Sequence, residues 1–419
     1  MRASLRSPIV GWVLYDFANT IFSFVVVTRY FNDWIIEEQG QPDIYVGLMT
    51  AVVSLALVAT LPLIGAHADR TGHMPILVPL SILCAAMTAL LGVVDPVWLA
   101  LVVAGVATYA FNSADSQYHP LLATVAPERS RGRISGTGVA FGYVGSLIAL
   151  FALGAYIEDG EAQKAFIPAA AMFLVFALPC FFLVRERDRP RTPAASRDQP
   201  FAQLAQSFRR ARTEPFGRLL LARFLYVDAL ATAIQFTGVY ARRTGDFDGD
   251  RIDLLLAIAA VAAIAGAIGG GLWAERAGPR RVVLATLVIT VASLAITAAT
   301  GVSELLWVAG PMLGFALGSL SAVDRIFLLR LVPEERRGED FALYAMVGKL
   351  SSGFGPLVLW GGTILFFTEV AGFSEFDASR VAVAVLAVSA LAGLLVLRPL
   401  SDDIRLAKPA NDSGTRSDP

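Results

Sequence analysis

Polar and ionisable side chains recur inside long apolar stretches of this sequence, at spacings of three or four residues that share one helix face. The candidates for contact with a solute are Tyr15, Asp16, Asn19, Asn112, Asp115, Tyr226, Asp228, Gln235, Asp324 and Lys349. A charge in an apolar medium costs at least about 2.5 kcal/mol, so these groups should face a cavity or a partner. Carboxylates, amides and an ammonium group together suit a polar or zwitterionic molecule, whose charges need partners when they leave water.

Motifs for chemical catalysis are missing from the sequence. The Gly348-Lys349 pair lacks the earlier glycine of a phosphate-binding loop. Cys84 and Cys180 lie in apolar runs and suit neither a disulfide scaffold nor a zinc site. The acidic segment 246–253 imitates a calcium loop only at its first positions, and we expect a solvated loop that caps a helix. We therefore expect no enzyme activity, no catalytic residue, no metal and no cofactor.

The elements that would position these side chains are long apolar segments. Apolar types make up 56% of the residues and charged types 16%, whereas about a quarter is charged in typical soluble proteins. The mean hydropathy is +0.62. Crossing a bilayer takes about 20 apolar residues. We expect spans at 9–31, 43–66, 75–94, 97–119, 133–156, 165–185, 216–241, 252–274, 281–300, 303–330, 339–367 and 378–398.

The distribution of positive charge predicts the orientation of these spans. With the amino terminus inside, the inner segments hold 25 of the 34 lysines and arginines and the outer loops hold five. Positive charge is retained on the cytoplasmic side, so both termini should be cytoplasmic. Inside the spans, Arg29 either gates the outer mouth or extends its side chain to the membrane surface, and Arg223 either has a partner or extends to the surface. Asp324 and Arg325 either line a cavity or anchor the inner end of a span.

A polar segment divides the spans into two sets of six. Residues 186–215 are charged and Pro-rich at first and then place Phe201, Leu204, Ala205 and Phe208 on one helical face. This pattern predicts an amphipathic helix on the inner leaflet, with a plain solvated linker as the alternative. The predicted divisions are an N-terminal six-helix bundle at 1–185, the linker at 186–215, a C-terminal six-helix bundle at 216–400 and a disordered tail at 401–419.

The two halves repeat each other. The turn GAHADRTG at 65–72 recurs as GLWAERAG at 271–278, and PERSRG at 127–132 recurs as PEERRG at 333–338, both 206 positions later. Duplicated helical halves are common in secondary transporters, with the solute site near the midplane. Small residues four apart, at Gly310, Gly314 and Gly318 and at Gly138 and Gly142, predict close helix packing.

The repeated turn resembles the signature loop of the major facilitator superfamily, which acts there as a latch between conformations. Its glycines allow a sharp reversal, and its acid can face the amino end of a helix. The latch residues that this resemblance implies are Gly65, Asp69, Arg70, Gly72, Glu275 and Arg276. An ordinary tight cytoplasmic turn is the alternative.

Four further segments resemble the autophagy-related vacuolar effluxer branch of that superfamily. They are YDFANTIFS at 15–23, PERSRGRISGTGVAFGYVG at 127–145, ARFLYVDA at 222–229 and GKLSSGFGPLVLWG at 348–361. The resemblance implies export of amino acids, by a protein with bacterial relatives in the plasma membrane, and a central cavity lined by spans one, four, seven and ten. Val227 and Ala229 depart from the family pattern.

The sequence thus predicts an all-α membrane protein with the major facilitator fold, about twelve spans in two bundles related by a pseudo-twofold axis. We expect secondary active export, by alternating access, of a small polar or zwitterionic solute such as an amino acid, with the membrane acids as candidates for proton coupling. The alternatives are a sugar or lipid-like amphiphile as solute, or a receptor without transport. Expected partners are the solute and membrane lipids, with no nucleic acid, for a monomer in the bacterial plasma membrane.

Overall fold

The computed structural model describes residues 6–127, 131–158, 160–186, 209–210, 215–299, 302–332 and 337–400, and these residues form helices joined by short connections. The first half contains α1 (Arg6–Phe22), η1 (Ser23–Tyr30), η2 (Asp33–Glu38), α2 (Asp43–Thr71), α3 (Met74–Leu91), α4 (Val97–Val125), α5 (Arg131–Gly154), η4 (Ala162–Ala165) and α6 (Phe166–Leu183). The second half contains α8 (Pro215–Gln235), α9 (Thr237–Arg243), α10 (Gly249–Ala277), α11 (Pro279–Ala299), η6 (Ser303–Leu305), α12 (Leu306–Leu331), α13 (Arg337–Phe354), η8 (Gly355–Gly362), α14 (Thr363–Glu369) and α15 (Glu375–Leu397).

These helices match the expected membrane spans. Among the described residues, eleven helices are long and apolar enough to cross a bilayer, and the number is twelve if α8 and α9, which meet at a bend of 54°, are counted as one span. The first span is longer than expected, because it continues through two π-helical segments, η1 and η2, as far as Glu38. π-Helical turns occur frequently at functional sites.

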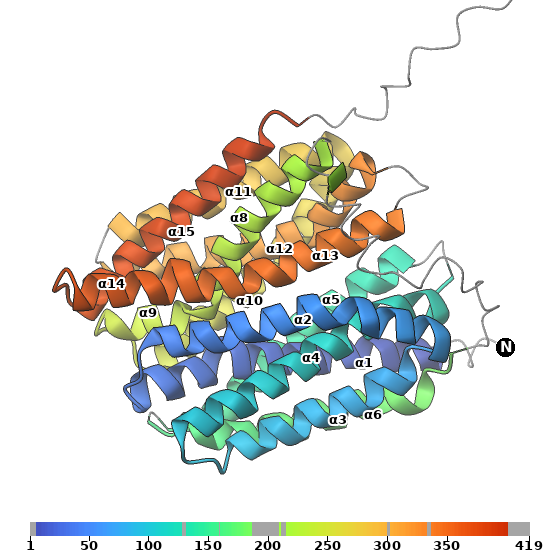
Figure 1. Cartoon of the computed structure of the whole chain (residues 1–419), viewed down its shortest axis with the longest axis horizontal. Coiled ribbons are helices and arrows are strands. Elements are labelled where there is room, and N and C mark those ends of the chain that lie inside the picture. Colours follow the sequence, from blue (N-terminus) through green and yellow to red (C-terminus); the bar gives the residue numbers. More distant parts are fainter. Residues whose placement is uncertain are drawn as a thin grey trace, which may run out of the picture.

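The spans form two groups that lie side by side (Figure 1). Helices α1–α6, drawn in blue to green, occupy one side, and α8 with α11–α15 occupies the other. The groups meet where α2 packs against α13 and η8, and where α5 packs against α10. Helix α1 begins and α15 ends at the same end of the molecule, which we call the terminal end. The opposite end, with the connections 39–42 and 244–248, is called the far end.

The repeat found in the sequence is visible in the helices. Helices α2 and α10 are both 29 residues long, and they begin and end 206 positions apart. Each ends at a glycine in the left-handed region, Gly72 with φ 97° and Gly278 with φ 88°. Residues with a Cβ rarely adopt this conformation, so the sharp reversal requires glycine at both positions. At Gly65 and Gly271, an added Cβ would have no described atom within 4 Å.

The close packing predicted from glycine spacing is confirmed. A methyl group at Gly314 or Gly318 of α12 would overlap the backbone of α10 at Ala259 or Ala263. In the first half, a methyl group at Gly142 of α5 would lie 2.6 Å from the Thr20 hydroxyl of α1. Small residues at these positions therefore set the distance between the helix axes.

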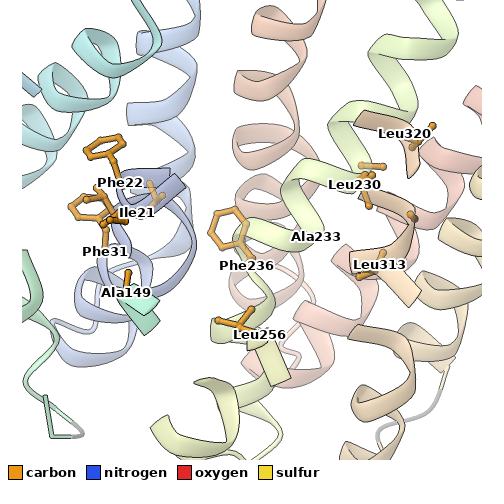
Figure 2. Packing of buried hydrophobic residues seen from close by; sticks show 14 of the residues in the cluster. Ile21, Phe22, Phe31, Ala149, Leu230, Ala233, Phe236, Leu256, Leu313 and Leu320 are labelled. Carbon is orange, nitrogen blue, oxygen red and sulfur yellow. The ribbon is translucent and has the colours of Figure 1, made fainter. Parts of the chain in front are cut away.

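Each half encloses apolar and aromatic side chains around its share of the core. Figure 2 shows two groups of these side chains, one from each half. The labelled residues are Ile21, Phe22, Phe31 and Ala149 in the first half, and Leu230, Ala233, Phe236, Leu256, Leu313 and Leu320 in the second. Aromatic rings also stack within the core. The rings of Phe236 and Trp360, for example, are stacked with their centroids 4.8 Å apart.

Two predicted segments fall largely outside the described residues. Of the expected amphipathic helix, only Arg209 and Arg210 are described, and both are helical. The predicted tail at 401–419 is outside the described part of the chain.

Candidate functional site

Four charged side chains from both halves gather between the bundles. Asp16 of α1 and Asp115 of α4 belong to the first half, and Arg325 of α12 and Lys349 of α13 to the second. Asp16 lies within electrostatic range of Arg325, and Asp115 lies within range of Arg325 and Lys349. The acids of one half therefore face the bases of the other. We call these four residues the central charge cluster.

Neutral side chains hold the cluster in place. The Asn19 amide donates a hydrogen bond to Asp115 Oδ1 at 3.2 Å. Lys349 Nζ donates a hydrogen bond to Asn112 Oδ1 at 2.5 Å. Asn112 lies one helical turn before Asp115 on α4. The polar residues that share one face of α1 and one face of α4 thus meet each other, and those of α4 also meet Lys349.

The charges of the cluster are incompletely neutralised. Among the described residues, neither Asp16 nor Lys349 forms an ion pair within 4 Å, and Asp115 pairs only with His119, at 3.5 Å. Arg325 is exposed, and the side chain of Asp115 keeps 25% of its surface exposed. Partly exposed, unpaired charges of both signs are available to bind a ligand that carries both charges.

An apolar cavity of about 150 Å³ lies beside the cluster, between both halves. Thr20 lines this cavity one helical turn after Asp16. Tyr143 also lines it, and shares a hydrogen bond with Ser321 of α12 across the interface. Much of the remaining lining is apolar and includes Phe24, Ile234, Leu256 and Leu313. The cavity can therefore take an apolar group but offers few polar partners.

The other predicted solute contacts make their hydrogen bonds outside the cluster. Tyr15 is fully buried within the first half, where its hydroxyl and that of Ser81 lie 2.6 Å apart. Gln235 lies at the bend between α8 and α9, and its backbone oxygen accepts a hydrogen bond from Asn32 at 2.7 Å. Both residues connect helices rather than line the space between the charges.

Asp324 forms a buried node within the second half. It is 4% exposed and accepts hydrogen bonds from Arg223, from Tyr344 and from Tyr226, the last at 2.6 Å. The Arg223 guanidinium lies over the Tyr344 ring, 3.7 Å from its centroid. Arg223 therefore pairs inside the bundle rather than extending to the surface, and the node ties α8, α12 and α13 together.

Asp228 takes a separate position on α8. It is 1% exposed, and one carboxyl oxygen accepts a hydrogen bond from the backbone N–H of Gly355 at 2.8 Å. Gly355 is the first residue of η8, where the eleventh span changes from α-helix to π-helix. Asp228 therefore contacts a helix irregularity and not the central charge cluster.

A network of ion pairs at the far end joins the two halves. Arg29 in η1 is 4% exposed and bonds Asp253 of α10 at 2.5 Å and Asp33 of η2 at 2.9 Å. Arg242 of α9 also bonds Asp33, at 2.8 Å. Arg29 is thus fixed by partners and does not extend to the surface. The expected solvated loop is wrong for Asp253, which is buried by this pairing, although Asp248 does cap α10 by accepting the Arg251 N–H at 2.9 Å.

A second group of far-end contacts connects α9, α2 and η8. Arg243 bonds Asp43 at the start of α2 at 2.7 Å. The indole N–H of Trp360 in η8 donates to the same carboxylate at 2.7 Å. We call the side chains in these two groups of contacts the far-end network: Arg29, Asp33, Asp43, Arg242, Arg243, Asp253 and Trp360. The sequence pattern does not predict this network, because its acids lie at the ends of the spans, where acidic residues are typical of loops.

The predicted latch residues lie at the terminal end. Arg70, Glu275 and Arg276 are exposed, and the side chain of Asp69 is outside the described part of the structure. The carboxylate of Glu186, just after α6, accepts a hydrogen bond from the backbone N–H of Met74 at 2.9 Å. This carboxylate also lies against Gly72, so the turn after α2 contacts the end of the first bundle.

Comparison with protein families gives a match to the model described as "Vacuole effluxer Atg22 like". The match runs over residues 43–364 and therefore includes both halves. It contains much of the central charge cluster, the Asp324 node, Asp228 and η8.

Individual relatives agree with this match. An uncharacterised MFS-type transporter of Bacillus subtilis, YxiO, is 27% identical over 83% of this chain and 86% of its own length. The autophagy-related protein 22 of Yarrowia lipolytica is 24% identical over 54% of this chain and 45% of its own length. The crystal structure of the nucleoside transporter NupG has a TM-score of 0.76 over 93% of this chain and 99% of its own, at 12% identity. This last likeness concerns the fold alone.

Proposed function

This chain belongs to the vacuole effluxer Atg22-like family of major facilitator transporters, and from that premise we propose that it exports a small zwitterionic solute, such as an amino acid, by alternating access. Membership makes it an integral membrane transporter with the major facilitator fold. Export, the amino-acid class and coupling to protons are the proposal. The family's description as effluxers supports the direction.

The central charge cluster carries this proposal. An amino acid brings an ammonium and a carboxylate, and both lose water when they bind between the bundles. Asp16 and Asp115 offer acids for the ammonium, while Lys349 and Arg325 offer bases for the carboxylate. Because the acids come from one half and the bases from the other, the solute itself would link the two halves during the conformational change.

Lys349 is the base best suited to bind the solute carboxylate. Its hydrogen-bond partner is the neutral Asn112, so its charge is not already balanced by a direct ion pair among the described residues. The alternative is that Lys349 balances Asp115 and the solute is neutral. These two roles differ in what they predict for stability and for binding.

A second candidate solute is a lipid-like amphiphile. The apolar cavity of about 150 Å³ beside Asp16 supports it, because apolar cavities of this size bind small apolar molecules. An amino acid with an apolar side chain would use the same space while both its charges meet the cluster. A sugar is the least suited of the three, since much of the lining carries no hydrogen-bonding group.

We propose a bacterial plasma membrane with the terminal end in the cytoplasm. The excess of lysine and arginine in the segments at that end supports this orientation. A bacterial relative of similar length supports the membrane. In this orientation the far-end network closes the outer side of the transporter.

A binding screen on the purified protein tests the solute class. Thermal shift with amino acids, sugars and phospholipids should give a rise in Tm for amino acids, because a ligand that binds the folded state stabilises it. Lys349→Ala should remove this rise while leaving the Tm without ligand close to that of the wild type. Lys164→Met is the matched control, since Lys164 is exposed at the far end and pairs with Glu161 in its own half.

The same variants distinguish binding of the solute by Lys349 from its alternative role, which is to balance the charge of Asp115. If Lys349 balanced Asp115, Lys349→Ala would cost roughly 3–5 kcal/mol of stability, as for other broken buried pairs. Adding Asp115→Asn would then restore the lost stability. A stable Lys349→Ala protein that binds amino acids as the wild type does would overturn the proposed solute contact.

A further inference from the structure

The Asp228 carboxyl group lies where the eleventh span loses its regular helix. Helix α13 passes at Gly355 into η8, with Pro356 as the second residue of the π-helical segment. Proline supplies no N–H and interrupts helical hydrogen bonding. The Gly355 N–H finds its acceptor on another helix, at Asp228 Oδ1, 2.8 Å away. A side chain at position 355 would overlap this carboxyl group and the Thr232 hydroxyl, so glycine is required for the contact.

Among the described residues, hydroxyl groups but no positively charged group lie near Asp228. Its second oxygen, Oδ2, is buried and has no hydrogen-bond partner among the described residues. Two fully buried hydroxyls nearby along the helices also lack described partners: Thr232, one turn after Asp228, and Ser351, one turn before Gly355. Asp324, in contrast, is equally buried but bonded to Arg223.

Among the described residues, no charged group lies within electrostatic range of Asp228, although the helices that pack against α8 carry several. Segment η8 has no titratable side chain, and α15 contacts α8 through Ser389, which donates to the Leu225 carbonyl. Several other titratable groups on these helices have partners of their own: Tyr226, Tyr344 and Arg223 with Asp324, Lys349 with Asn112, Arg29 with Asp33 and Asp253, and Arg380 with the Ala298 and Ala299 carbonyls.

An ionised carboxylate in this position would be buried without a counter-charge, which is strongly unfavourable inside a membrane protein. A neutral carboxylic acid avoids this cost and also supplies an O–H donor for the buried hydroxyls. We propose that Asp228 is the proton-binding site of this transporter, protonated when the far end is closed. In the release step its O–H bond breaks, the electron pair stays on the carboxylate oxygen, and the proton passes to a water molecule that enters between α8 and η8.

Segment η8 links this site to the far-end network. At the start of η8, the Gly355 N–H donates to Asp228. Five positions later, the indole N–H of Trp360 donates to Asp43 of α2 at 2.7 Å. Between them, the Pro356 carbonyl lies against Gly47, so close that a Cβ at Gly47 would be 2.5 Å from it. Water can reach an ionised Asp228 only if η8 moves away from α8, and this movement would also disturb the Trp360 contact with the other half.

The inference rests on the proposed transport function, but it predicts a pH effect that needs no solute. Raising the pH should ionise Asp228 and favour the open far end. The ion pairs of the far-end network should give the opposite pH response. Acid removes the charge of Asp33, Asp43 and Asp253, so lowering the pH weakens closure through these pairs. The direction of the pH response therefore identifies the group responsible.

The first test is infrared spectroscopy of the protein in lipid nanodiscs. Wild type should show the C=O band of a protonated carboxylic acid at neutral pH, shifted when aspartate is ¹³C-labelled and lost in Asp228→Asn. The labelled wild type makes the result independent of whether the variant folds. Absence of an aspartic-acid band, or its persistence in Asp228→Asn, would overturn the assignment.

The second test measures the far end directly by electron–electron resonance between spin labels at Gln39 and Asp250, with Cys84 and Cys180 replaced by alanine. Both labelled positions are exposed, and they belong to different halves. The label distance should lengthen as the pH rises in wild type and should stay short in Asp228→Asn, which mimics the neutral acid. Asp246→Asn, at an exposed far-end loop, is the control and should respond as wild type does. An unchanged pH response in Asp228→Asn would contradict the link, whether or not the protein transports amino acids.

Discussion

Replacing Arg29 by methionine should open the far end of this transporter. The Arg29 side chain is 4% exposed and bonds both Asp253 and Asp33. After Arg29→Met, Asp33 keeps its bond to Arg242, whereas Asp253 loses the cation it pairs with. The side chain of Asp253 is only 12% exposed, so the closed state would hold a buried carboxylate without a counter-charge.

The size of the effect follows from the cost of breaking a buried ion pair, roughly 3–5 kcal/mol. This cost falls on the closed state alone, because water reaches Asp253 once the far end opens. At 1.4 kcal/mol per tenfold change, the ratio of closed to open molecules should fall by roughly 10² to 4 × 10³. The spin-label pair at Gln39 and Asp250 would report this change as a longer distance.

Two further variants control the measurement. Arg29→Met combined with Asp253→Asn removes the unpaired charge and should recover much of the short distance. Lys164→Met also removes a far-end cation, but its side chain is 55% exposed and pairs within its own half, so the distance should not change. A folded Arg29→Met protein with the wild-type distance would refute the claim that this ion pair holds the halves together.

Three other predictions address the topology, the packing and the latch. A cysteine at Asp248 should react with an impermeant reagent from outside the cell and one at Ala195 should not, whereas equal labelling would contradict the proposed orientation. Gly318→Ala should lower stability by about 1–3 kcal/mol through overlap with α10, whereas Gly271→Ala, with open space, should leave the Tm unchanged or slightly raised. Asp69→Asn should slow turnover more than it weakens solute binding, and loss of binding with normal turnover would argue against a latch.

The sequence was sufficient to predict the fold and its branch of the superfamily, and both predictions are confirmed. Span positions depend on hydrophobic length, which is a property of the local sequence. Halves that repeat at 206 positions also leave local marks, such as the glycines that end α2 and α10. These signals do not require knowledge of which helices touch.

The site was harder to predict because helical spacing does not say what a polar face contacts. The polar faces of α1 and α4 meet each other, and that of α4 meets Lys349. Asp228 and Asp324, on α8 and α12, look alike in sequence but have different surroundings. Arg29 and Asp253 are 224 residues apart, and nothing local marks them as partners. Their pairing depends on the tertiary arrangement of the two bundles.

Flux through reconstituted protein tests the central claim most directly. Proteoliposomes loaded with a labelled amino-acid mixture should release it faster than protein-free vesicles. Lys349→Ala and Asp115→Asn should abolish the difference, while Lys164→Met should retain it. Binding of amino acids without any release above that of protein-free vesicles would contradict the account and would leave a membrane receptor in place of a transporter.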